Sequence, residues 1–303
     1  MGIISPIMSF IVDRESGFPA PSEREKINKA LEKYRGILKK YPQRADSGEI
    51  KFGMADLLVG RNDPGDYEKA HAQYEDILRN YASPYLRARA QVGRAELLVP
   101  GIKKEAIGEA LALCETARKN LGKADISDFF VAKTFIIEAD LRLVRDEPGD
   151  HKKALGIHEK LVKNRKTHWY FRARAQLGKA ELVLYHYPKK LTEGITLCEK
   201  AANLLRERKG DYFNEKIKLI EGELLIRRAK KDDFKKAEAL LKELVGEPNA
   251  YKDLLARGRL DLAEISRSPA ARQYLKEVEE MEGLDPYILD KVRQVEKKLS
   301  PNK

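Results

Sequence analysis

The sequence has few of the residues that mark disulfide-rich, collagen-like or membrane proteins. Cysteine occurs only twice in 303 residues, at Cys114 and Cys198. This excludes a disulfide scaffold and any Cys-x-x-Cys metal or haem motif. Glycine and proline, with 20 and 13 residues, are not enriched, so collagen-like and low-complexity chains are also excluded. No apolar run reaches the roughly 18 to 20 residues that a membrane-spanning helix needs.

The sequence also lacks the common catalytic motifs. It has no Walker A loop, no Gly-x-Gly-x-x-Gly after a strand and no Gly-x-Ser-x-Gly elbow. Paired acids such as Asp232-Asp233 and Glu279-Glu280 are typical of helix starts or solvated faces. Four of the five histidines lie between residues 151 and 200, at His151, His158, His168 and His186. No two histidines have the spacing of a helical metal-binding pair, so we expect no enzyme activity, no metal and no cofactor.

Charge is abundant but unevenly distributed. Charged residues make up 35% of the chain and hydrophobic residues 42%, and the net charge is +11. Residues 1–150 hold 24 basic and 24 acidic side chains, whereas residues 151–200 hold 12 basic and 4 acidic ones, a net charge of +8. The excess positive charge is therefore local, and it marks a candidate docking surface for an acidic partner.

Internal repeats indicate the architecture. Residues 85–97, YLRARAQVGRAEL, match residues 170–182, YFRARAQLGKAEL, and PGDYEKA at 64–70 matches PGDHKKA at 148–154. These offsets of 85 and 84 residues indicate a duplicated segment. A shorter period lies inside it, because a small residue precedes a larger one by four positions at intervals of 40 to 44 residues. The pairs are Ala30/Tyr34, Ala70/Tyr74, Ala110/Cys114, Ala154/His158, Gly194/Cys198 and Ala237/Leu241.

Each period contains two stretches of apolar residues at helical spacing, separated by loop signals. They predict first helices near 48–59, 86–99, 127–143, 169–184, 212–228 and 250–265. Second helices are predicted near 66–80, 104–120, 151–163, 190–207, 233–245 and 269–281, with flanking helices at 24–40 and 285–299. The predicted fold is all-α, an α-solenoid of helix pairs. Both cysteines occupy the larger position of the repeat pair, so we interpret them as buried thiols.

The repeats resemble the tetratricopeptide (TPR) family. The pattern Ala30-x3-Tyr34-x2-Ile37-Leu38-x3-Pro42 is similar to the second helix of a TPR with its closing proline. The pairs Val92-Gly93 and Leu177-Gly178 are similar to the large-small pair of its first helix. Residues 34–42, YRGILKKYP, resemble bacterial envelope-assembly TPR proteins. The resemblance implies a right-handed superhelix whose first helices line a concave, peptide-binding groove.

In this interpretation residues 24–281 form the repeat array. Residues 1–23 are an N-terminal extension, and residues 282–303 are a C-terminal capping helix and tail. The apolar stretch from Gly2 to Val12 is broken by Pro6 and lacks a basic flank, so we expect no signal peptide and a cytoplasmic location. A periplasmic or other envelope location is the alternative that the TPR relatives imply.

Basic and acidic residues recur in the first helices. A base stands seven residues before an acid in the four central repeats but not in the terminal ones. The pairs are Arg89 and Glu96, Lys133 and Asp140, Arg174 and Glu181, and Lys216 and Glu223. Seven residues span almost two helical turns, so the base of one repeat could instead meet the acid of the next. The pattern predicts an interhelical ion ladder or, alternatively, a charged groove that clamps a peptide.

A second constellation runs from Lys160 to Arg174, KLVKNRKTHWYFRAR, and holds the only tryptophan. Its candidate partner-binding residues are Lys163, Arg165, Lys166, Trp169, Tyr170 and Arg172. Bases interleaved with aromatics suit a protein interface, and they equally suit phosphates or stacked bases. The plainer interpretation is that the aromatic side chains pack between helices and the lysines are solvated.

These features together favour a non-catalytic protein–protein interaction scaffold, an assembly or recruitment subunit of a larger complex. Its partners would present an acidic surface or an extended segment, and self-association is a further expectation. The alternative is a helical-repeat module that binds RNA or another polyanion through residues 151–200.

Overall fold

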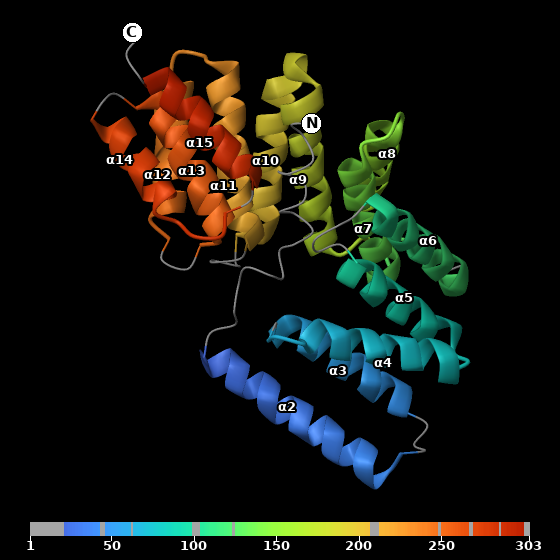
Figure 1. Cartoon of the computed structure of the whole chain (residues 1–303). Coiled ribbons are helices and arrows are strands. Elements are labelled where there is room, and N and C mark those ends of the chain that lie inside the picture. Colours follow the sequence, from blue (N-terminus) through green and yellow to red (C-terminus); the bar gives the residue numbers. More distant parts are fainter. Residues whose placement is uncertain are drawn as a thin grey trace. The chain divides into compact units, whose positions relative to one another are not determined.

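The computed structural model of the chain is built from helices (Figure 1). It describes residues 21–42, 46–61, 63–98, 104–122, 125–206, 212–247, 250–266, 269–284 and 286–299. Within these ranges all regular structure is helical and no residue lies in a β-strand, so the all-α prediction is confirmed. Most of the predicted N-terminal extension, residues 1–20, and the end of the predicted tail lie outside the described residues.

Every predicted helix is present, with its ends displaced by at most three residues. In chain order the helices are α2 (Pro21–Lys40), α3 (Ser47–Arg61), α4 (Asp66–Asn80), α5 (Pro84–Leu98), α6 (Lys104–Leu121), α7 (Phe129–Arg145), α8 (Asp150–Lys163), α9 (Trp169–His186), the 3-10 turn η1 (Pro188–Lys190), α10 (Leu191–Leu205), α11 (Tyr212–Arg228), α12 (Asp233–Val245), α13 (Lys252–Ile265), α14 (Ala270–Glu279) and α15 (Pro286–Leu299). The predicted first helices are odd-numbered, and the second helices are even-numbered.

The chain divides into two compact units, with the boundary between Asp150 and His151. In the unit before the boundary, α2 to α7 pack in sequence, and α3, α5 and α7 also contact one another in order. In the other unit, α9 to α15 pack in sequence, and α9, α11, α13 and α15 also contact one another in order. Within each of these two runs of helices, each helix therefore packs on its neighbour, and each odd-numbered helix also packs on the next odd-numbered one. This is the contact pattern of an α-solenoid.

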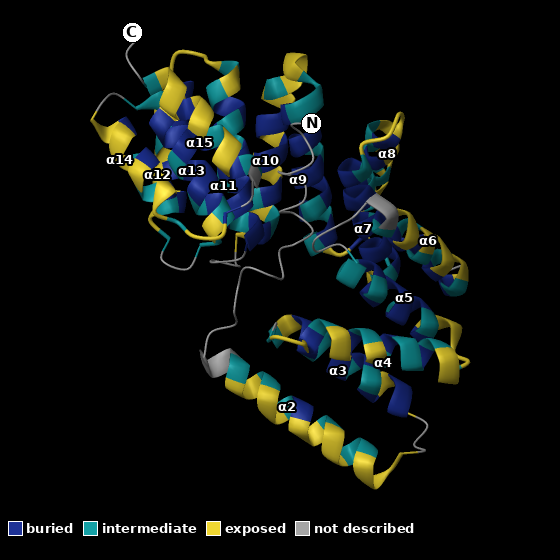
Figure 2. Ribbon diagram, in the orientation of Figure 1, coloured by how far each residue is buried: buried dark blue, intermediate teal, exposed yellow. Residues whose placement is uncertain are grey.

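Burial follows this arrangement. Figure 2 shows α11 and α13 largely buried, whereas α12 and α14 have exposed outer sides. The amphipathic spacing of the even-numbered helices explains this difference, because such helices bury one stripe and expose the rest. The odd-numbered helices of this unit thus contribute residues from most of their circumference to the core.

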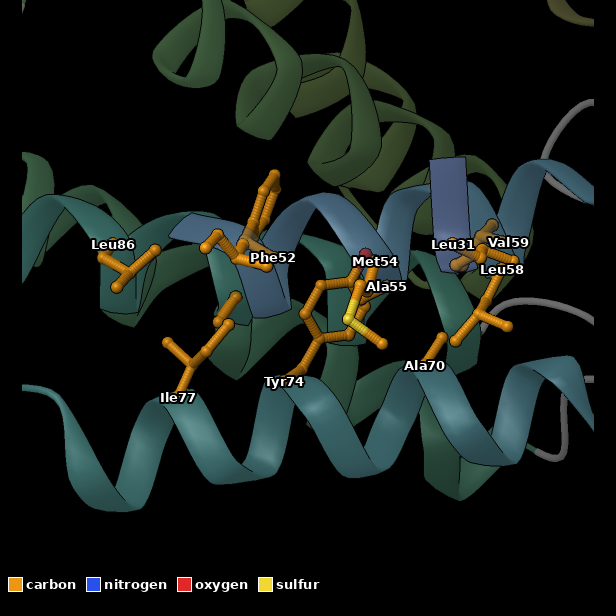
Figure 3. Packing of buried hydrophobic residues seen from close by; sticks show 12 residues of the cluster. Leu31, Phe52, Met54, Ala55, Leu58, Val59, Ala70, Tyr74, Ile77 and Leu86 are labelled. Carbon is orange, nitrogen blue, oxygen red and sulfur yellow. The ribbon is translucent and has the colours of Figure 1, made fainter. Parts of the chain in front are cut away.

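The repeat marker positions lie in the core. Ala70 and Tyr74 of α4 are fully buried, and in Figure 3 they point toward α3, where Phe52 and Met54 lie. The rings of Phe52 and Tyr74 are 5.8 Å apart. The equivalent pairs Ala110/Cys114, Ala154/His158 and Ala237/Leu241 are fully buried as well. Both cysteines are buried and free, which confirms their prediction as buried thiols.

Glycine at the facing position lets the larger marker residue approach the next helix. A Cβ atom on Gly93 of α5 would lie 2.3 Å from the Tyr74 ring, and one on Gly178 of α9 would lie 2.5 Å from Nε2 of His158. Contacts this short do not occur between real atoms, so any side chain here would force the two helices apart. The glycines of the Val92-Gly93 and Leu177-Gly178 pairs are therefore required by close helix packing.

An arginine–aspartate pair closes three of the helix-to-helix turns. Arg61, Arg145 and Arg228 end α3, α7 and α11, and each donates two hydrogen bonds of 2.6–2.8 Å to the aspartate five residues later. These aspartates, Asp66, Asp150 and Asp233, are the buried first residues of α4, α8 and α12. Each also accepts a backbone N–H at 2.9–3.2 Å from the residue three positions earlier. The carboxylate at the helix start is thereby fully hydrogen-bonded and favourably placed at the positive end of the helix dipole.

Candidate partner-binding site

Ion pairs join each odd-numbered helix to the next within both units. The later helix supplies the base in every case. The pairs are Glu49 with Arg89 (α3 and α5), Glu96 with Lys133 (α5 and α7), Glu181 with Lys216 (α9 and α11), Glu223 with Arg257 (α11 and α13) and Asp261 with Lys291 (α13 and α15). The N···O distances of the second, third and fourth pairs are each 2.8 Å. We call these five pairs the ion ladder.

The ion ladder differs from the sequence prediction in two respects. The acid of one repeat meets the base of the following repeat, whereas the sequence led us to expect the base of one repeat to meet the acid of the next. The pairing also continues beyond the four central repeats, where we expected it to stop. In α13 the base of the pair is Arg257, which lies three residues after the predicted slot at Leu254, almost one helical turn along the same face.

The ladder is buried most deeply in the unit that begins at His151. The side chains of Lys216 and Glu181 are 0% and 4% exposed, whereas that of Glu49 is 52% exposed. Burial raises the pKa of the Glu181 carboxyl, and the facing Lys216 ammonium offsets this only in part. Removing one partner of such a pair destabilises the fold, because the other charge is left buried without compensation.

Tyr185 and Arg257 connect ladder pairs in the same unit. Arg257 donates to Glu223 Oε1 at 2.8 Å and to the Tyr185 hydroxyl at 2.9 Å. Although burial opposes it, the charges of Arg257 and Lys291 hold the pKa of Glu223 below its usual value. Burial also works against the ammonium of Lys291, but Asp261 and Glu223 raise its pKa to about 12. The ladder charges therefore alternate in sign along the odd-numbered helices and compensate one another.

The remaining predicted ladder residues also lie on odd-numbered helices. Asp140 of α7 is buried. Arg174 of α9 lies over the Phe213 ring at 4.9 Å, and Arg89 lies over the Phe52 and Phe130 rings at 4.0 and 4.7 Å. Arginine on an aromatic face gains cation–π attraction in addition to its ion pairs. These contacts are interhelical, and they support the structural interpretation of the ladder over the groove interpretation.

The basic constellation folds into a compact corner between α8 and α9. Asn164 accepts backbone hydrogen bonds from Lys166 and Thr167, at 2.9 and 3.0 Å. His168 caps α9, because its Nδ1 accepts from Tyr170 N at 3.3 Å. We call residues Lys163 to Arg172 the basic corner. Its turn is held by local hydrogen bonds, so its charged side chains project from a defined backbone.

Most basic side chains of the corner are more exposed than its aromatic ones. Lys163, Arg165 and Lys166 are exposed, whereas Trp169, Tyr170 and Arg172 are half-buried. Phe171, the following residue, is 1% exposed. The six predicted partner-binding residues are thus brought together, while Phe171 belongs to the core.

Tyr170 connects the corner to α11. Its ring meets the Phe213 ring edge-on with centroids 5.6 Å apart, and Tyr212 meets Tyr251 in the same way at 4.7 Å. Edge-to-face contacts are a favoured aromatic geometry. The aromatic edge of the corner is therefore backed by a row of packed rings at the starts of three successive odd-numbered helices.

Few acids balance the bases of this part of the chain. Exposed bases between residues 151 and 200 are Lys152, Lys153, Lys160, Lys163, Arg165, Lys166, Lys189, Lys190 and Lys200. Of the four acids, Glu181 is buried and only Glu193 and Glu199 are exposed. The positive charge of the window consequently lies at the surface, where it attracts acidic groups.

The sequence patterns described above do not predict the arginine–aspartate turns, and they indicate only a helix start or a solvated face at Asp232-Asp233. A signal was present: Arg61, Arg145 and Arg228 each precede an aspartate by five residues, at offsets of 84 and 83 residues. Spacing of this kind becomes interpretable only when a turn is known to lie between the two residues.

The comparisons with known proteins are negative. No family model, no curated protein and no solved structure matches this chain. None of the helices in the described ranges combines the length and apolar character needed to cross a bilayer. The described residues likewise contain no cluster of three or more His, Cys, Asp or Glu side chains arranged to hold a metal ion.

Proposed function

We propose that the chain is a TPR-like, right-handed helical-repeat scaffold that recruits an acidic protein partner at the basic corner. The observation that carries this proposal is the juxtaposition of Lys163, Arg165 and Lys166, all exposed, with the half-buried Trp169 and Tyr170. Tryptophan, tyrosine and arginine contribute most to binding at protein interfaces.

The mechanism combines shape with charge. The corner is held by the Asn164 turn, the His168 cap and the packed Tyr170 ring, so little ordering entropy is lost when a partner binds. The exposed bases accelerate encounter with acidic surfaces. Trp169 then supplies apolar contact area once the partner is docked. The ion ladder stabilises the scaffold and takes no direct part in recognition.

The test is affinity purification from native lysate with three purified baits. The first is the wild-type chain, and the second carries Arg165→Ala, Lys166→Ala and Trp169→Ala. The third carries Lys189→Ala and Lys200→Ala, which removes the same number of exposed charges from the same window outside the corner. Circular dichroism and the melting temperature establish that all three baits are folded.

The proposal predicts proteins that the wild type and the control bait recover equally and the corner variant recovers at least tenfold less. Nuclease treatment should leave this recovery unchanged. If the corner variant recovers the same partners as the wild type, the corner is not the recognition surface. If recovery depends on RNA and weakens steeply with salt, the polyanion-binding alternative replaces the protein scaffold.

A further inference from the structure

Two histidines that are 35 residues apart in the sequence come together between α8 and α9. His151 is the second residue of α8, and His186 is the last residue of α9. The centroids of their imidazole rings lie 3.6 Å apart and the ring planes are inclined by 36°. These rings are therefore in direct contact.

Helix packing explains why they meet. Farther along the same two helices, the ring of His158 contacts Gly178. His151 lies seven residues before His158, and His186 lies eight residues after Gly178, so each is about two helical turns from that contact. Because α8 and α9 run in opposite directions, two turns back along α8 and two turns forward along α9 end at the same level of the helix pair. The histidine pair is thus held by the core of the repeat.

The chemistry of the pair is that of metal ligands. The Nε2 atoms of both rings are enclosed within the structure, and the two residues as a whole are half-buried. Neutral imidazole nitrogen binds zinc, copper and nickel in preference to magnesium or calcium, with Zn–N distances of about 2.0–2.1 Å. Binding one ion at this contact requires each side chain to rotate so that one nitrogen of each ring faces the ion.

We propose that His151 and His186 form a two-histidine binding site for a divalent transition metal ion of the zinc class. The described residues supply no cluster of three suitable side chains, so water would complete the coordination. The site is therefore unlike a closed structural zinc site, which has four protein ligands. Its effect is to strengthen the contact between α8 and α9 when the metal is bound, because a ligand that binds only the folded state stabilises it.

The test is isothermal titration calorimetry of the full chain with zinc chloride at pH 7.5. Variants His151→Phe and His186→Phe keep a flat ring in the contact but remove the nitrogen ligand, and His151→Gln and His186→Gln repeat the comparison if a phenylalanine variant does not fold. The control is His168→Ser, which removes an exposed histidine and retains an N-cap for α9.

The proposal predicts one zinc ion bound per chain, with at least tenfold weaker binding in each substitution of His151 or His186 and unchanged binding in His168→Ser. Zinc should also raise the melting temperature of the wild type and not that of the double variant His151→Phe/His186→Phe. Absence of zinc binding by the wild type, or binding that is equally tight in the His151 and His186 variants, would overturn it.

Discussion

One position of the repeat accepts several side chains that differ in chemistry but share one environment. Tyr74, Cys114, His158, Cys198 and Leu241 all occupy it, and all are fully buried. Burial raises the pKa of the Cys114 thiol to about 12 and that of Cys198 well above its ordinary value. Since the thiolate is the reactive form, both cysteines serve as small core residues. The position thus selects for size and packing, and chemical reactivity is suppressed there.

His158 is the residue at this position whose ordinary pKa lies near neutral pH, and it predicts a pH dependence of stability. Burial, together with the nearby charges of Arg174 and Lys179, lowers its pKa from 6.5 to about 3. The unfolded chain therefore takes up a proton below about pH 6.5 that the folded chain does not, so stability falls as the pH decreases. Between pH 7 and pH 5 this amounts to about 2 kcal/mol.

His158→Leu, which places the residue of the α12 repeat at this position, should remove that contribution. Urea denaturation of the wild type and the variant at pH 7 and pH 5 measures it. The wild type should lose about 2 kcal/mol more than the variant over this interval. Equal losses would show that His158 is protonated, or accessible to protons, in the folded state.

At the scale of the helix, the pairs of the ion ladder differ in how deeply they are buried, and this difference sets how much the loss of one partner costs in folding free energy. The pair of Glu181 and Lys216 is enclosed, whereas Glu49 at the α3 end of the ladder is 52% exposed. Removing one member of a buried pair leaves a charge without compensation, which costs about 3–5 kcal/mol. An exposed pair contributes less than about 1 kcal/mol.

The matched substitutions Glu181→Gln and Glu49→Gln test this difference, because each replaces a carboxylate with a neutral amide of nearly the same shape. Glu181→Gln should lower the free energy of unfolding by about 3–5 kcal/mol, and Glu49→Gln by less than about 1 kcal/mol. The double variant Glu181→Leu/Lys216→Met should recover most of the loss, because no buried charge remains. Similar losses in the two single variants would show that the ladder is not a structural feature of the core.

The sequence predicts the positions of the helices well, because they depend on nearby residues, but it does not predict which side chains meet between helices. Helix positions follow from local periodicity, and even the two-residue shift at the start of α7 has a local cause, since Asp128 caps the helix through hydrogen bonds to Phe130 N and Val131 N. The partners in the ladder were not predictable, because spacing within one helix places Arg257 on a face but does not say which neighbour it meets. The contact of His151 with His186 is likewise set by the crossing of two helices.

At the scale of the whole molecule, the distribution of charge matters more than its sum. The net charge of +11 would suggest a generally basic protein, yet the ladder pairs and the arginine–aspartate turns match many bases with acids. Residues 151–200 carry +8 of this charge, and most of their bases are exposed at the surface. We therefore propose an ion-paired scaffold that carries one basic docking corner.

Hydrogen–deuterium exchange can test whether the partner binds at the basic corner and leaves the ion ladder untouched. It is measured on the full chain alone and with the partner recovered by affinity purification. We expect the partner to slow exchange in residues 160–174, while the ladder segments of α11 and α13 exchange at the same rate with and without it. Unchanged exchange in residues 160–174, with protection along the odd-numbered helices instead, would contradict the account and support a charged peptide-binding groove.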